Sequence, residues 1–274
     1  MAIPLEDNVS DIIGKAQRGL GISDSQLAEK AGVSAEKIRR LREGAFEDDV
    51  IERAGPALNL DAAALKKLAN GEWSPEPVAE FAGLAQFNTT YGDMTVNAYL
   101  MWDPASREAI AFDTGADCGE MLERIAAEKL TVKLILLTHA HPDHVADLRR
   151  LRKETRAPVY ISEREEAEGA EAIAEGKRFR LGSLEIESRM TWGHSPGGMT
   201  FVVTGLTRPV AIVGDSLFAA SMGGGNVSYE AALRNNREKI LTLADETIVC
   251  PGHGPLTTVG KEKRDNPFFA TLKE

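Results

Sequence analysis

The sequence predicts a mixed α/β (α+β) protein with a small all-α helical bundle at its N-terminus. Of its 274 residues, 43% are hydrophobic and 27% are charged, which is enough apolar material for an ordinary buried core. The composition changes near residue 71. Before it the chain is rich in Ala, Lys, Glu and Leu in helical patterns, and after it β-branched and aromatic runs alternate with glycine turns.

The change falls at residues 71–77 (GEWSPEP), where two prolines stand two residues apart. Proline cannot continue a helix, and it suits an extended linker. We therefore expect a helical domain over 1–72, a linker over 73–80 and a second domain over 81–274.

The N-terminal part predicts short, capped helices. Ser23 and Gln26 have the spacing of a capping box, and Gly32 is placed to end that helix. Ser34 can cap the following helix, and Asp61 can cap a last one that ends near residue 70. The spacing thus predicts three of the helices in this region.

Residues 26–44 (QLAEKAGVSAEKIRRLREG) resemble the helix-turn-helix of the Xre/Cro-like repressor family, within a region of about 8–70. The resemblance implies a five-helix bundle whose helix over 34–42 enters a DNA major groove, with residues 23–44 as the binding segment. The contacts it implies are Ser34, Lys37, Arg39 and Arg40.

The charge of this region favours a different interpretation. Residues 1–70 carry ten basic and twelve acidic side chains, so they have no positive surplus to release counterions from DNA. The whole chain has a formal charge of −10. If the bundle does not bind DNA, we expect a docking or dimerisation module, and a homodimer is one assembly it allows.

The sequence also indicates a compartment. No apolar run approaches the 18 residues of a membrane span, and residues 1–10 have neither the basic nor the apolar region of a secretion signal. The two cysteines, Cys118 and Cys250, form no disulfide framework and fit a reducing environment. We expect a cytoplasmic protein without membrane association.

All five histidines follow residue 71, and three of them lie within six residues. Residues 134–144 (LILLTHAHPDH) predict a buried strand that runs into this cluster, and a helical pattern follows it. The cluster therefore sits in a strand-to-helix loop. The five are His139, His141, His144, His194 and His253.

Their spacing is typical of metal ligands. His139 and His141 stand two apart on an extended segment, so their side chains point the same way and can chelate one ion. Asp143 and His144 are adjacent and can point to a second ion, while Pro142 restricts the backbone between the pairs. Imidazole and carboxylate together suit zinc, with iron or manganese as alternatives.

Five short motifs occur in order: 113–115 (DTG), 138–144 (THAHPDH), 193–198 (GHSPGG), 214–218 (GDSLF) and 251–255 (PGHGP). Together they resemble the metallo-β-lactamase fold superfamily, from about residue 81 onward. The resemblance implies an αββα sandwich whose site lies at one edge, between two β-sheets.

The resemblance also implies two divalent metal ions and the residues that bind them. His139, His141 and His194 would hold the first, Asp143, His144 and His253 the second, and Asp215 both. Asp143 is thereby a catalytic candidate, and Asp113 would orient the histidine loop without binding metal. A metal-bound hydroxide would attack the substrate carbonyl.

Within the superfamily, residues 193–198, 214–221 and 251–269 look like the short form of the glyoxalase II-like hydrolases. This implies cleavage of a small thioester or ester, as in hydroxyacylglutathione hydrolases. Only 21 residues follow His253, so the glutathione contacts of the longer enzymes are missing or rebuilt. The acyl donor and the substrate-binding residues are therefore left open.

Three alternatives compete with this interpretation. A persulfide dioxygenase has the same fold and would use one iron at His139, His194 and Asp215. A DNA-binding regulator would use the metal domain as a sensor, and would bind DNA in a salt-sensitive way. A lactonase, or less favoured a β-lactamase, would use the same two-metal chemistry.

Two further segments carry weaker expectations. Residues 87–95 (FNTTYGDMT) lie between two strand-like runs and predict a plain hairpin loop; the alternative is a segment that overhangs the site, with Tyr91 and Met94 as contacts. Residues 163–171 (EREEAEGAE) predict a solvated helix face.

Overall fold

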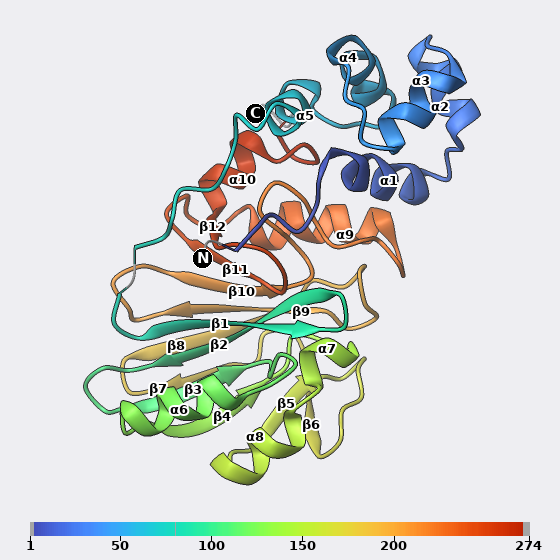
Figure 1. Cartoon of the computed structure of the whole chain (residues 1–274). Helices are drawn as coiled ribbons and strands as arrows, with labels where there is room; N and C mark the ends of the chain where they lie inside the picture. Colours follow the sequence, from blue (N-terminus) through green and yellow to red (C-terminus); the bar gives the residue numbers. More distant parts are fainter. Residues whose placement is uncertain (1–2, 80, 271–274) are drawn as a thin grey trace.

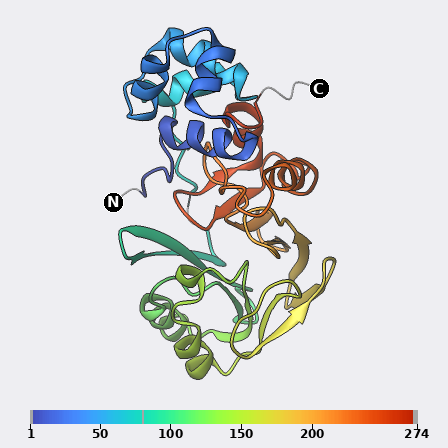
Figure 2. The same cartoon turned by 90° about the vertical axis from the view of Figure 1, so that its right-hand side faces the viewer.

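Two six-stranded β-sheets pack face to face, with helices on the outer face of each sheet (Figure 1). The computed structural model describes residues 3–79 and 81–270. Helices α6 and α8 lie on one side of the sandwich, α9 and α10 lie on the other, and the short α7 lies at the edge where the strands end. Five further helices, α1 to α5, lie beyond α9 and α10 (Figures 1 and 2). The predicted αββα sandwich with N-terminal helices is confirmed.

The five N-terminal helices are short and begin at polar caps. Ser23 forms the predicted capping box with Gln26, and Ser34 and Asp61 cap the third and fifth helices as predicted. Asn8 and Asp11 form a second capping box that the sequence analysis missed. The helices are α1 (Val9–Leu20), α2 (Asp24–Ala31), α3 (Ala35–Arg42), α4 (Asp48–Ala57) and α5 (Ala62–Ala69).

The first sheet has the strand order β1-β2-β3-β4-β5-β6. Strands β1, β2 and β3 are antiparallel, and the pairs from β3 to β6 are parallel. The strands are β1 (Leu84–Tyr91), β2 (Met94–Trp102), β3 (Glu108–Phe112), β4 (Thr131–Leu136), β5 (Val159–Ser162) and β6 (Ala170–Ile173). The helices beside them are α6 (Gly119–Ala127), α7 (Pro142–Val145) and α8 (Leu148–Thr155).

The second sheet has the order β12-β11-β10-β9-β8-β7, and its β10 and β11 run parallel. Its strands are β7 (Arg178–Leu181), β8 (Leu184–Met190), β9 (Met199–Thr204), β10 (Val210–Gly214), β11 (Ile248–Pro251) and β12 (Thr257–Thr258). The helices on its outer side are α9 (Tyr229–Asn235), a turn of π-helix η1 (Asn236–Ile240), and α10 (Val259–Asp265).

Three apolar clusters hold these layers together. One lies between the sheets and includes Phe112 and Phe201, whose ring centroids are 5.7 Å apart. A second fills the space between the first sheet and α6 and α8. The third joins the outer face of the second sheet to α9 and to the N-terminal helices, through buried residues such as Ile13, Tyr229 and Phe268. The N-terminal helices therefore share a core with the sandwich.

The contact between α1 and α9 is close. A Cβ atom added at Gly19 of α1 would lie 2.2 Å from the ring of Tyr229, so only glycine fits there.

A second contact joins the start of α5 to the end of the chain that the structure describes, where the backbone N–H of Asp61 donates to the Pro267 carbonyl at 2.8 Å. Residues 72–79 have no regular secondary structure, and the domain division at 72 and 80 stays a prediction.

Two sequence expectations are wrong in the structure. Residues 163–171 form no helix, because turns lead into β6, which pairs with β5. Residues 87–95 do form a hairpin, but the expected extent of its loop is wrong, because β1 continues to Tyr91, β2 begins at Met94 and only Gly92 and Asp93 form the turn. Among the described residues, no helix is both long and apolar enough to span a membrane.

Candidate metal centre

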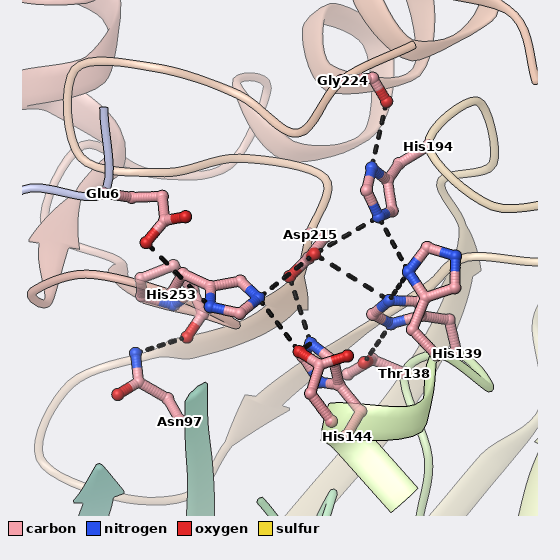
Figure 3. Close-up of polar contacts among 12 residues, drawn as sticks. Glu6, Asn97, Thr138, His139, His144, His194, Asp215, Gly224 and His253 are labelled. Carbon is pink, nitrogen blue, oxygen red and sulfur yellow. Dashed lines mark hydrogen bonds and ion pairs between the residues drawn. The ribbon is translucent and has the colours of Figure 1, made fainter. Parts of the chain in front are cut away.

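Four loops bring the predicted ligands together at one edge of the sandwich. In the first sheet, β4 leads into residues 139–144 beside the end of its parallel neighbour β3. In the second sheet, parallel β10 and β11 lead into Asp215 and His253, and the loop before β9 carries His194. Because parallel strands end at the same edge, these side chains converge (Figure 3).

A first group of ligand atoms consists of three imidazoles and one carboxylate. His141 Nδ1 lies 3.0 Å from His139 Nε2 and 3.1 Å from His194 Nε2. Asp215 Oδ2 lies 3.3 Å from His194 Nε2 and 3.9 Å from His139 Nε2. One ligand atom from each of the four lies within 4.8 Å of the others, a spacing that can hold a cation.

A second group consists of Asp143, His144 and His253. Asp143 Oδ2 lies 3.3 Å from His253 Nε2 and 3.5 Å from His144 Nε2. Asp215 also reaches this group, with its Oδ1 3.3 Å from His144 Nε2 and its Oδ2 3.4 Å from His253 Nε2. Asp215 therefore stands between the two groups.

Hydrogen bonds on the far side of the rings orient four of the five histidines. His139 Nδ1 donates to Thr138 Oγ1 at 3.1 Å, since that hydroxyl itself donates to Asp113. The other three acceptors are Asp113 Oδ2 for His144 at 2.8 Å, the Gly224 carbonyl for His194 at 3.0 Å, and the Thr95 carbonyl for His253 at 2.6 Å. A proton on Nδ1 leaves Nε2 free as a ligand atom facing the centre.

The donor set fits metal ions, and two buried atoms indicate the same. His144 Nε2 and Asp215 Oδ1 are buried and have no hydrogen-bond partner among the described residues. Polar atoms are seldom buried without partners, because their desolvation is then uncompensated. Both atoms face the centre, where a cation would satisfy them.

The backbone leaves little spare room around these groups. A Cβ atom at Gly252 would lie 2.1 Å from Asp215 Oδ1 and 2.6 Å from the ring of His144. A side chain at this position would thus push into the ligand groups. Glycine in the 251–255 motif is therefore required by the approach of the two loops.

The electrostatics of the centre are those of a site that binds protons or cations. Burial would raise the pKa of Asp215, but His253 and His144 hold it well below its ordinary value. Burial would lower the pKa of His144, but Asp215 and Asp113 raise it to about 10. Burial lowers the pKa of His139 well below its usual range, and the neighbouring His144 adds to the effect. A cation in the centre would replace the proton on a histidine such as His144, whose pKa is raised.

Asp113 lies behind the ligands rather than among them. Its Oδ1 accepts from the Thr138 backbone N–H at 2.8 Å, and its Oδ2 accepts from the Thr138 hydroxyl at 2.7 Å as well as from His144. It is buried, with a positive φ of 55°. The carboxylate fixes the start of the histidine loop.

The predicted DNA contacts lie elsewhere, on α3. Ser34 is occupied as the helix cap, where it accepts from the backbone N–H of Lys37. The three basic side chains pair with acidic neighbours on α3, on α4 and in the loop between them. The pairs are Lys37 with Glu47 and Asp49, Arg39 with Glu36 and Glu43, and Arg40 with Glu47.

Sequence reasoning missed three partners of the centre: Glu6, Thr95 and Gly224. Thr95 and Gly224 contribute carbonyls, which any residue carries, so their identity gives no signal. Glu6 Oε2 lies 4.0 Å from His253 Nδ1 (Figure 3). No sequence pattern connects the start of the chain to this motif.

Three large apolar side chains are exposed among the described residues, and each lies in a segment that neighbours a hydrogen-bond partner of the histidines. Tyr91 and Met94 flank the β1–β2 turn, next to Thr95, and Val227 follows the Gly224 loop. The backbone N–H of Val227 donates to the Gly193 carbonyl beside His194. Whether the hairpin residues contact substrate stays a prediction.

A sequence match identifies the family of the chain. The profile of the metallo-beta-lactamase superfamily matches residues 91–253, which include all seven grouped ligands. The chain therefore belongs to the metallo-beta-lactamase superfamily. The matched range begins after α1 to α5, so the helix-turn-helix resemblance stays a prediction.

Two curated relatives match nearly two thirds of the chain. A probable metallo-hydrolase, YqgX of Bacillus subtilis, is 32% identical over 204 aligned positions, and the match covers 65% of this chain and 94% of the relative. The hydroxyacylglutathione hydrolase GloC of Haemophilus influenzae is 30% identical over 198 aligned positions, and the match covers 63% of this chain and 92% of that protein.

Two solved structures share the fold. The BLEG-1 B3 metallo-beta-lactamase has a TM-score of 0.60 and 32% identity, over 68% of this chain and 98% of that one. TTHA1623, solved in a di-iron-bound form, has a TM-score of 0.56 and 29% identity, over 67% of this chain and 100% of that one.

Proposed function

We propose that the protein is a dinuclear metal-dependent hydrolase that cleaves a small thioester or ester. The observation that carries this proposal is the pair of ligand groups with Asp215 between them. His139, His141 and His194 would hold one divalent ion, and Asp143, His144 and His253 the other. Zinc suits the imidazole-rich set best, with iron or manganese as alternatives.

The residues of this chain prepare the site for hydrolysis. Two divalent ions would lower the pKa of water toward neutrality and polarise a carbonyl group. The chain keeps the Nε2 atoms of His139, His144, His194 and His253 free through hydrogen bonds to their Nδ1 atoms. Asp113 holds the Asp143 and His144 turn in place through Thr138 and His144.

The thioester assignment is supported by similarity to GloC, a hydroxyacylglutathione hydrolase, at 30% identity. The short motifs at 193–198, 214–221 and 251–269 resemble the same group of hydrolases. A substrate with a carbonyl flanked by sulfur or oxygen suits a site with two Lewis acids.

The proposal is tested by elemental analysis of protein purified without added metal, beside the variant His144→Ala. We expect two ions per chain, falling toward one in the variant, together with loss of hydrolysis of a hydroxyacylglutathione thioester. A single iron that is retained in His144→Ala would contradict the dinuclear hydrolase. It would direct the search to oxygen consumption with a persulfide substrate.

A further inference from the structure

Residues near the start of the chain lie next to the candidate metal centre. Residues 3–8, which we call the N-terminal strap, run past the 251–255 loop and lead into α1 (Figures 1 and 3). A Cβ atom at Gly254 would lie 3.2 Å from the Glu6 backbone nitrogen and 3.6 Å from the Pro4 carbonyl. The strap therefore packs directly on the loop that carries His253.

Buried polar contacts fix the strap in this position. Asp7 is buried, accepts from Ser221 Oγ at 2.6 Å and is paired with Lys15 of α1. Lys15 Nζ also donates to the Met222 carbonyl at 2.9 Å and lies 4.9 Å above the ring of Phe218. The strap, α1 and the loop after Asp215 are thereby tied into one unit.

This anchoring places the Glu6 carboxylate beside His253. Its Oε2 lies 4.0 Å from His253 Nδ1, the ring nitrogen that faces away from the ligand group. The side chain is 28% exposed and forms no hydrogen bond with another residue that the structure describes. The N–H at Nδ1 already donates to the Thr95 carbonyl. Glu6 therefore places a carboxylate behind His253, in addition to the neutral Thr95 carbonyl.

We propose that Glu6 is a positioning residue for His253, so that the N-terminal helices help to build the second metal position. The inference rests on the proposed dinuclear function. A carboxylate behind a ligand imidazole restrains the ring and makes its other nitrogen a better donor, and removal of such partners typically weakens metal binding by 10-fold to 100-fold. Because 4.0 Å exceeds a hydrogen bond, we expect an effect near the lower limit.

The test compares Glu6→Gln with the wild-type chain and with Glu29→Gln. Glu29 is an exposed residue of α2, so this control removes the same charge from the same bundle away from the centre. Competition with a chromophoric chelator, with Zn²⁺ as the probe, gives the two stepwise dissociation constants. We expect one of the two dissociation constants to rise about tenfold in Glu6→Gln while the other changes less, and we expect neither to change in Glu29→Gln.

A further variant separates positioning from a general effect on folding. Glu6→Asp keeps the charge but shortens the reach, so it should restore part of the lost affinity. Equal dissociation constants in Glu6→Gln and wild type would overturn the inference while leaving the hydrolase proposal intact. A wild-type protein that binds fewer than two Zn²⁺ ions would overturn the dinuclear hydrolase, and this inference with it. Thermal unfolding by circular dichroism verifies that each variant is folded.

Discussion

At the scale of single residues, Asp113 determines how the ligand loop is presented. Its two carboxylate oxygens accept three hydrogen bonds, from the Thr138 backbone, the Thr138 hydroxyl and His144. All three partners are donors, so the position requires a group that only accepts. An ionised carboxylate meets this requirement and an amide does not.

We expect Asp113→Asn to weaken the second metal position about 10-fold to 100-fold, because its NH₂ group would face the His144 and Thr138 donors. Chelator competition measures the effect. The matched control is Asp117→Asn, which changes an exposed aspartate of the same loop that pairs with Arg150. Equal affinities in Asp113→Asn and wild type would show that Asp113 does not orient the ligand.

The residues of the centre were predictable to different degrees. The histidine cluster was evident because its ligands lie close together in sequence, after a strand that the apolar run predicts. Asp113 was predicted only through the family motif, since an aspartate at a strand end also suits a turn. Glu6 was missed because its proximity to His253 depends on how α1 packs on the sandwich.

At the scale of elements, three basic residues of α3 are paired with carboxylates. Lys37, Arg39 and Arg40 each lie within 3.2 Å of a carboxylate oxygen. Exposed ion pairs are individually weak, so they would not prevent binding by themselves. They do leave this face without the positive surplus on which phosphate contacts depend.

We therefore expect no salt-sensitive DNA binding by this protein. Fluorescence anisotropy with a labelled duplex at 50 mM and 200 mM salt measures it, and the variant with Arg39 and Arg40 changed to Ala is the comparison. Binding that falls steeply with salt and is lost in the variant would instead support a DNA-binding regulator.

Helix α10 carries a buried carboxylate that connects three parts of the chain. Glu262 accepts from the Ala220 backbone at 2.9 Å, the Thr257 hydroxyl at 2.7 Å and the Asn266 amide at 2.8 Å. Burial nevertheless outweighs these bonds and raises its pKa from 4.5 to about 7. The folded chain therefore binds a proton at Glu262 more tightly than the unfolded chain does.

This predicts that Glu262 lowers stability as the pH rises from about 4.5 to about 7, by on the order of 3 kcal/mol in total. The sign follows because the folded state holds more protons in this window. Urea unfolding at several pH values measures the slope. In Glu262→Gln the contribution should vanish, so an unchanged difference between variant and wild type across the window would contradict the shift.

Element prediction failed where tertiary contacts decide the structure. The charged run at 163–171 has helix-forming residues, but Glu165 accepts from the Gly197 backbone and the segment then joins β6 to the sheet edge. Pairing with β5 satisfies the backbone hydrogen-bonding groups of β6. Helix propensity, which depends on neighbouring residues only, does not include this contribution. The caps at Ser23, Ser34 and Asp61 were predictable because they depend on neighbouring residues only.

At the scale of the whole molecule, the N-terminal helices and the sandwich share buried apolar residues. Ile13, Leu27 and Leu65 belong to the same cluster as Val249 of the second sheet and Phe268 near the C-terminus. The sequence boundary near residue 71 marks a change in composition, but it does not reveal this packing. Contacts between distant segments leave no periodic pattern in the sequence.

We expect the bundle and the sandwich to unfold together. Phe268→Ala removes a buried ring from the shared cluster and should lower the free energy of unfolding by about 3–5 kcal/mol. The urea concentration at the midpoint of unfolding should fall by the same amount whether it is followed by the helix signal in circular dichroism or by tryptophan fluorescence. The control Phe179→Ala changes a ring on β7 that packs in the cluster between the sheets. Separate transitions in Phe268→Ala would show that the two parts are independent.

The contact between Asp7 and Ser221 spans 214 residues of sequence. During synthesis the strap leaves the ribosome long before its partner, by roughly 10–40 s at 5–20 residues per second. In that interval Asp7 of the strap can pair with Lys15 of α1, but Ser221 and the 251–255 loop have not yet been made. The last ligand, His253, also emerges late. The segments that meet at the candidate metal centre therefore come together only after the 251–255 loop has been made, when most of the preceding helices and strands have already left the ribosome.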